Sequence, residues 1–178
     1  MKKPWKRTIS PSEFDLLVGS LLNLPITRAW RGYGSALFLE LGELRPADPP
    51  RRDGTPRMKG EGTIMIQWSW RVERARSIEV GSWSTDARID SGIARLGGLQ
   101  VVALAVDGRL PELIVGLSDG CWLRSFMTAE GQPEWTVFLP DESWLTVERG
   151  RIVHDTRNQV RSAGRDSSIS GNDDGALG

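Results

Sequence analysis

The chain has 178 residues, of which 39% are apolar and 26% charged, and its 23 basic residues balance its 23 acidic ones. Charged residues interrupt every apolar run, so the sequence predicts a soluble cytoplasmic protein without a membrane span. The single cysteine, Cys121, excludes an internal disulfide framework and a cysteine-rich zinc site. A net charge of zero also argues against a general nucleic-acid binder.

Composition divides the chain into three parts. Residues 1–10 form a basic N-terminal extension, residues 11–154 a single α+β domain, and residues 155–178 a polar tail that we expect to be disordered. Within the domain, residues 45–60 hold four prolines and no apolar period, which predicts a mobile surface loop.

The first expected element is a helix over residues 11–22, whose apolar residues recur at helical spacing. Ser10 and Glu13 have the spacing of a capping box, and Pro11 takes the first helical position, where its missing donor costs nothing. A strand over residues 35–44 follows, with Leu37, Leu39 and Leu41 on one side and Phe38 and Glu40 on the other.

Within residues 63–74 every even position from Ile64 to Val72 is apolar, and the odd positions are polar except for Met65. This period of two predicts one strand buried on a single face. Trp68 and Trp70 share the apolar register, so both are expected in the core. A short strand over residues 77–80 comes next. A second helix then runs from Ser84 or Thr85 to Leu96, with a hydroxyl as N-cap and Gly97-Gly98 as its end.

From Leu99 to His154 the chain predicts a meander of six short strands, with Asp107-Gly108 and Asp119-Gly120 as type I′ turns. The sum is an α+β fold with a curved, mostly antiparallel sheet of about nine strands and two helices. Partial closure of the strands into a small barrel is the alternative.

Basic residues gather in the first part of the sequence, where residues 1–60 hold 11 basic and 6 acidic side chains. Two groups stand out, one in the proline-rich loop and one at the N-terminus beside Trp5. They could bind phosphates or an acidic protein face, or simply be solvated. The loop group comprises Arg51, Arg52, Arg57 and Lys59, and the terminal group Lys2, Lys3, Lys6 and Arg7.

Eight tryptophans are the unusual feature of the composition. Trp122, Arg124 and Phe126 share one register of a predicted strand, opposite Cys121 and two smaller residues. If the smaller residues face inward, the three form an exposed binding stripe. A large aromatic loses more by exposure, so a core position is favoured for Trp122.

Catalytic and metal-binding motifs do not emerge, and we expect no cofactor, no metal and no catalytic residue. Cys121 and His154 could meet as a thiol and imidazole pair, although a buried small residue and a strand-end histidine are the simpler reading. Any two of four glutamates could serve a carboxylate-based hydrolase, but the sequence does not select a pair. These are Glu112, Glu130, Glu134 and Glu148.

Three stretches, residues 34–42, 68–73 and 117–126, resemble small bacterial hypothetical proteins without an assigned activity, over about residues 12–154. The resemblance implies a bacterial cytosolic accessory protein of partner or immunity type, and it transfers no functional residue. Our leading hypothesis is therefore a non-enzymatic protein that binds another protein. The alternatives are a nucleic-acid-contacting accessory factor and, more weakly, a hydrolase.

Overall fold

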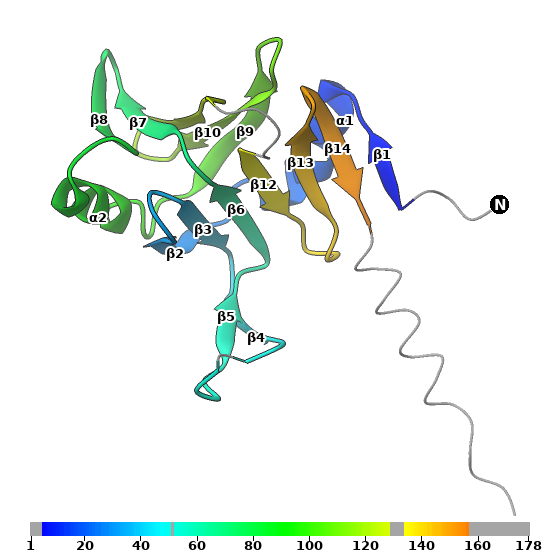
Figure 1. Ribbon diagram of the computed structural model, residues 1–178, viewed down its shortest axis with the longest axis horizontal. Coiled ribbons are helices and arrows are strands. Elements are labelled where there is room, and N and C mark those ends of the chain that lie inside the picture. The colour runs from blue at the N-terminus through cyan, green and yellow to red at the C-terminus, as the bar shows by residue number, and fades with distance from the viewer. Residues whose placement is uncertain (1–4, 51, 129–133, 157–178) are drawn as a thin grey trace, which may run out of the picture.

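The computed structural model describes residues 5–50, 52–128 and 134–156. Antiparallel strands and two α-helices make up the fold, which confirms the predicted α+β class (Figure 1). The described residues form fourteen strands in three sheets rather than one sheet of about nine, and the sheets do not close into a barrel. The count and the barrel alternative are therefore wrong. The predicted tail beyond Thr156 and the first four residues lie outside the described residues.

The largest sheet has seven strands in the order β1-β14-β13-β12-β6-β3-β2. Its strands are β1 (Lys6–Thr8), β14 (Arg151–Asp155), β13 (Trp144–Glu148), β12 (Trp135–Phe138), β6 (Gly62–Ile66), β3 (Leu37–Leu41) and β2 (Ile26–Arg31). The basic N-terminal segment thus provides an edge strand, β1, which pairs with β14. Neither β1 nor β2 was expected from the sequence, because neither alternates clearly between apolar and polar residues.

A second sheet has five strands in the order β8-β7-β11-β10-β9. They are β8 (Ser77–Gly81), β7 (Trp70–Arg74), β11 (Cys121–Ser125), β10 (Glu112–Leu117) and β9 (Val101–Asp107).

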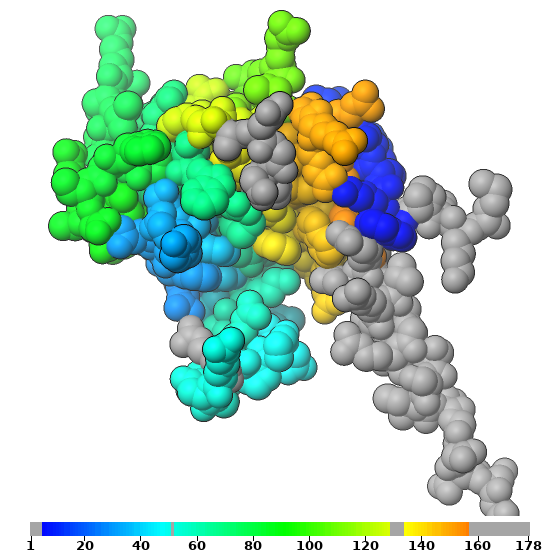
Figure 2. All heavy atoms as spheres, in the orientation of Figure 1, coloured from blue at the N-terminus to red at the C-terminus, as the bar shows by residue number. Residues whose placement is uncertain are grey.

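The third sheet is the hairpin β4 (Arg45–Ala47) and β5 (Arg57–Lys59), in place of the irregular loop expected over residues 45–60. We call this hairpin and its turn, residues 45–59, the arm. It stands away from the body (Figures 1 and 2).

The alternating segment 63–74 is two strands that belong to different sheets. β6 ends at Ile66 and β7 begins at Trp70, and the intervening residues carry the chain from one sheet to the other. This break reverses the expected position of one indole, since Trp70 is fully buried whereas Trp68 is 44% exposed. The prediction for Trp70 is confirmed and that for Trp68 is wrong, because alternation does not persist through a crossover.

Two buried indoles connect the sheets across a shared core. Trp70 of β7 donates from Nε1 to the carbonyl oxygen of Ser35, 2.6 Å away, in the loop before β3. Trp135 of β12 donates to the carbonyl oxygen of Pro111, 2.7 Å away, just before β10. Each indole thus packs its apolar area in the core while its N–H satisfies a backbone acceptor of the opposite sheet.

The helices follow the sequence predictions closely at their starts. The capping box of α1 (Pro11–Val18) forms as expected, with the Glu13 amide donating to Ser10 Oγ at 3.2 Å, and a 3₁₀ turn continues the helix to Leu21. Phe14 packs edge-on against Trp135. The second helix, α2 (Asp86–Ala94), packs beside β2 and β8, and its N-cap Thr85 makes no side-chain hydrogen bond.

The Asp-Gly turns form where expected, but with a different geometry. A type I′ turn needs a positive φ at both central residues. Gly108 and Gly120 have φ angles of 88° and 83°, whereas the aspartates before them are not among the positive-φ residues. The glycines alone therefore supply the left-handed conformation in these two connections.

Candidate functional site

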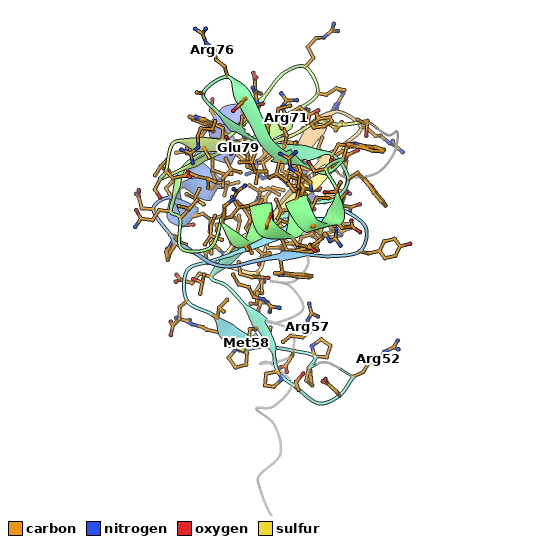
Figure 3. The ribbon with its side chains drawn as sticks, turned by 90° about the vertical axis from the view of Figure 1, so that its left-hand side faces the viewer. Arg52, Arg57, Met58, Arg71, Arg76 and Glu79 are labelled. Atoms are coloured by element: carbon orange, nitrogen blue, oxygen red, sulfur yellow. The ribbon has the colours of Figure 1, made fainter. Side chains whose placement is uncertain are left out.

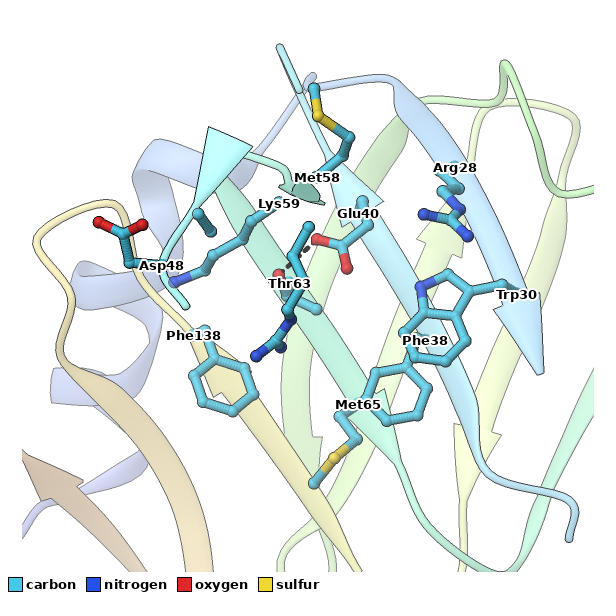
Figure 4. Close-up of a pocket in the computed structure, with 12 residues that line it drawn as sticks. Arg28, Trp30, Phe38, Glu40, Asp48, Met58, Lys59, Thr63, Met65 and Phe138 are labelled. Carbon is cyan, nitrogen blue, oxygen red and sulfur yellow. Dashed lines mark hydrogen bonds between the residues drawn. The ribbon is translucent and has the colours of Figure 1, made fainter. Parts of the chain in front are cut away.

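A cleft of about 630 Å³ lies between the arm and the outer face of the seven-stranded sheet (Figure 4). Its walls come from four adjacent strands, β2, β3, β6 and β12, and from the arm. The inward side chains of these strands fill the core, so alternation turns their neighbours outward into the cleft. One cross-strand row holds Trp30, Phe38 and Met65, and the next holds Arg28, Glu40, Thr63 and Phe138.

The aromatic floor of the cleft is tightly stacked. Trp30 and Phe38 lie with ring centroids 4.1 Å apart and planes 7° from parallel. The guanidinium of Arg28 lies over the Trp30 ring, 5.6 Å from its centroid, although register sets Arg28 opposite Glu40. The indole nitrogen of Trp30 is buried and has no hydrogen-bond partner among the described residues. Such an unmet donor costs about 1–3 kcal/mol.

Glu40 fixes the base of the arm. Its side chain is 5% exposed, and its Oε2 accepts from Thr63 Oγ1 at 2.6 Å and from the Gly60 amide at 3.0 Å. Gly60 has no room for a side chain, because a Cβ there would collide with the backbone of Leu41. The arm is therefore anchored at a defined point where it leaves β3 and enters β6.

Three cationic side chains line the cleft. Arg28, Arg57 and Lys59 make no ion pair within the described part of the chain. Lys59 instead lies 5.6 Å from the centroid of the Phe138 ring. The lining combines this positive charge with the flexible apolar side chains of Met58 and Met65. Such a surface fits a ligand that is partly apolar and carries negative charge.

The predicted basic residues do not form one surface. Arg57 lines the cleft, Arg52 is exposed near the end of the arm (Figure 3), and Arg51 lies outside the described residues. Lys6 and Arg7 lie in β1, at the opposite edge of the seven-stranded sheet from β2. The first pairs with Glu148 at 2.6 Å and the second with Glu13 at 2.7 Å. Lys2 and Lys3 lie outside the described residues.

Trp122, Arg124 and Phe126 occupy the outer side of β11 and the residues after it, because Cys121, Leu123 and Ser125 face the core. The favoured core position for Trp122 is wrong, since this side chain is 44% exposed and packs over Gly116. The glycine provides a flat backbone on which the indole rests, so exposure costs less than expected.

The arginines on this face form ion pairs within the chain. Arg124 pairs with Asp107 at 3.1 Å. Arg71, which pairs with Glu73, lies over the Phe126 ring at 5.4 Å from its centroid. The structure thus exposes the predicted stripe and leaves it with few unmet groups.

The thiol and imidazole considered as a pair belong to different sheets. Cys121 lies in β11, where burial raises the pKa of its thiol, and His154 lies in β14, where burial lowers the pKa of its imidazole. His154 Nε2 lies 3.0 Å from Ser143 Oγ. The described residues contain no cluster of three or more potential metal-ligating His, Cys, Asp or Glu side chains.

The three candidate glutamates that the structure describes do not line the cleft. Glu112 accepts from Ser125 Oγ and the Met127 amide, which holds the end of β11, and Glu148 pairs with Lys6. Glu134 accepts from the Thr128 amide, and Glu130 lies outside the described residues. The carboxylates that do line the cleft are those of Glu40 and Asp48.

The basic loop group predicted from the sequence includes two residues that line the cleft, Arg57 and Lys59, but most of the other lining residues were not predicted. The missed floor residues are Arg28, Trp30, Phe38, Glu40, Met65 and Phe138. Part of the signal was available, because the alternation over residues 35–44 already set Phe38 and Glu40 on the side away from the core. The position of the arm above this face was not encoded in any local pattern.

Comparisons with family models, curated proteins and solved structures find no match to this chain. Among the described residues, no helix is long and apolar enough to cross a membrane.

Proposed function

We propose that this protein is a non-enzymatic accessory or immunity-type protein, and that it acts by binding a segment of another protein in the cleft beneath the arm. The observation that carries the proposal is the lining of the cleft. Aromatic and methionine side chains stand beside three cations that have no ion-pair partner within the described residues. Its volume of about 630 Å³ falls in the range that accommodates a few side chains.

The arm supports a protein partner over a small molecule. It extends the basic wall of the cleft outward, from Lys59 and Arg57 to the exposed Arg52 (Figure 3). A ligand confined to the cleft would not reach Arg52, whereas an extended polypeptide segment would contact both. Methionine side chains such as Met58 adapt to varied apolar partners at low cost.

A nucleic acid is the less favoured partner for the same surface. Single-strand binding relies on aromatic faces that are free for bases to stack on. The Trp30 ring has Phe38 on one side and Arg28 over it, and the Phe138 ring has Lys59 over it. Because the cations of β1 lie at the other edge of the sheet, they do not extend the cleft's positive surface.

Selection from a displayed library of random linear peptides tests the proposal. Peptides are selected on the unmodified protein, and their affinity is then measured for the double variant Arg57→Glu/Lys59→Glu. We expect a loss of about tenfold or more, since both reversals place negative charge beside the bound segment. Arg76→Glu is the matched control, because Arg76 is exposed at the opposite end of the molecule from the arm (Figure 3) and should leave affinity unchanged.

Two results would overturn the proposal. One is that the selected peptides bind the double variant as tightly as the unmodified protein. The other is that a single-stranded oligonucleotide binds with higher affinity than any peptide and loses that affinity in the double variant. The second result would favour the nucleic-acid alternative. Circular dichroism of each variant establishes that the fold is retained.

A further inference from the structure

The indole N–H of Trp30, which has no acceptor among the described residues, indicates which chemical group a ligand of the cleft carries. Buried polar groups are satisfied almost without exception, so a buried N–H without a partner calls for an explanation. The Trp30 N–H is such a group, and it lies in the wall of the cleft rather than in the core. In Figure 4 the indole nitrogen is on the edge of the ring that faces the cleft.

Packing prevents the indole from turning toward another acceptor. Phe38 is stacked on the ring at 4.1 Å between centroids, and Arg28 lies over it at 5.6 Å. Because the N–H is buried, an acceptor that reaches it from the cleft must displace a neighbouring side chain. A carboxylate in that position can accept from the indole N–H and also pair with the nearby Arg28 guanidinium.

The surrounding charge also favours an anionic acceptor over a neutral carbonyl. Arg28, Arg57 and Lys59 have no ion-pair partner among the described residues, whereas the Oε2 atom of Glu40 already accepts two hydrogen bonds. Asp48 is exposed on the arm. The cleft thus has three cations against two carboxylates, one of which is committed to holding the arm.

We propose that the partner segment inserts an aspartate or glutamate side chain whose carboxylate accepts from Trp30 Nε1 and pairs with Arg28. An adjoining apolar side chain of the same segment packs against Phe138, Met58 and Met65. This inference rests on the proposed function, since it names the feature of the partner that the cleft recognises. It makes Trp30 and Arg28 the specificity-determining residues of the site.

The test uses the peptides selected in the library experiment. Each acidic residue of a selected peptide is replaced by its amide, Asp→Asn or Glu→Gln, and one replacement should weaken binding about tenfold or more. Trp30→Phe keeps an aromatic ring beside Phe38 but removes the N–H, and Arg28→Gln removes the charge. Both variants should bind the unmodified peptide about tenfold more weakly and no longer distinguish the acid from the amide.

A spectroscopic signal separates recognition from a general effect on the fold. In ¹⁵N-labelled protein, the indole resonance that disappears in Trp30→Phe belongs to Trp30, and it should move downfield when the acidic peptide binds. Trp83→Phe is the matched control, because Trp83 is 87% exposed and does not line the cleft. Its affinity and its discrimination between acid and amide should equal those of the unmodified protein.

The outcomes distinguish this inference from the proposed function. If peptides depend on Arg57 and Lys59 but tolerate every amide replacement, or if the Trp30 resonance stays fixed on binding, the inference is wrong and the binding function stands. If peptide affinity is insensitive to Arg57 and Lys59 as well, the proposed function fails and the inference fails with it.

Discussion

The outer faces of the two large sheets are built from the same residue types and differ in how their polar groups are used. On the five-stranded sheet, Arg124 pairs with Asp107 and Arg71 pairs with Glu73, while Trp122 rests on Gly116. On the seven-stranded sheet, Trp30 and Arg28 leave a donor and a charge without partners among the described residues.

The difference shows why residue type alone is a poor guide to a binding surface. A tryptophan beside an arginine is a frequent component of interfaces, yet the first face has already formed its interactions within the chain. The second face retains unmet groups and lies beneath a projecting arm, which makes it the better candidate for a partner.

The largest expected difference in stability is between replacing Trp70, whose indole N–H has an acceptor, and replacing Trp30, whose indole N–H has none among the described residues. Trp70→Phe removes a fully buried N–H that donates to the Ser35 carbonyl at 2.6 Å, and it leaves a small cavity. We expect a loss of about 3 kcal/mol in the free energy of unfolding. Trp30→Phe removes an N–H without an acceptor among the described residues. Relief of this unmet donor opposes the loss of ring contacts with Phe38, so the net change should stay within about 1 kcal/mol. Urea denaturation measures the unfolding free energy of both variants. Equal losses would contradict the expected difference between Trp70 and Trp30.

The next effect concerns Glu40, the cleft carboxylate whose Oε2 atom accepts two hydrogen bonds. Glu40→Ala removes the acceptor for the Gly60 amide and the Thr63 hydroxyl, and should cost about 2 kcal/mol of unfolding free energy. Hydrogen exchange at the Gly60 amide should become faster. Asp48→Ala is the control, since Asp48 is exposed on the arm and should affect neither quantity. Unchanged exchange at Gly60 would mean that Glu40 does not anchor the arm.

A smaller effect compares the arginines of the two faces. Arg124→Gln breaks a partly exposed ion pair with Asp107, which is worth less than about 1 kcal/mol of stability. Arg28→Gln breaks no ion pair within the described residues and loses only its contact with the Trp30 ring, so it should lower the unfolding free energy no more than Arg124→Gln does while it weakens peptide binding. A double-mutant cycle with Asp107→Asn isolates the Arg124 pair. A larger loss of unfolding free energy in Arg28→Gln than in Arg124→Gln would mean that Arg28, not Arg124, is the arginine that stabilises the fold.

The smallest effect is a dependence on pH that belongs to the five-stranded sheet. Burial alone would raise the pKa of Asp119, but hydrogen bonds from the Cys121 amide and from Arg74 lower it further than burial raises it. Because the folded-state pKa is below that of the unfolded chain, the ionised carboxylate stabilises the fold at neutral pH. This stabilisation is lost as the pH falls through the folded-state pKa, below about pH 4.

Urea denaturation at pH 5 and pH 3 measures this dependence. Asp119→Asn should flatten it, whereas Arg28→Gln and the unmodified protein should show the same slope. A variant Asp119→Asn that keeps the full acid sensitivity would show that other carboxylates carry it.

Local signals in the sequence predicted the parts of the fold that local physics determines. The Ser10–Glu13 capping box, the buried Trp70 and the positions of the six C-terminal strands were predicted correctly. The single six-stranded meander was wrong, because the chain changes sheets between β11 and β12. The crossover that exposes Trp68 was missed because its apolar and polar residues alternate as they would in a continuous strand. The arm was missed because prolines obscured two strands of three residues each.

The cleft could not be predicted from local patterns either, because its residues come from strands that are far apart in the sequence. Phe38 and Glu40 were correctly set on the side of β3 away from the core, but nothing local shows that β2, β6 and β12 add Trp30, Met65 and Phe138 to the same face. For Trp122, exposure was underestimated because the supporting Gly116 comes from the neighbouring strand.

The arm meets the body at two fixed points in the chain. Gly42, with a φ of 74°, leads out of β3, and Gly60, held by Glu40, leads back into β6. Between these junctions most of the described residues are exposed, and none of them belongs to the buried core. We therefore expect grafts that change the length or composition of the hairpin between these junctions to leave the core packing intact.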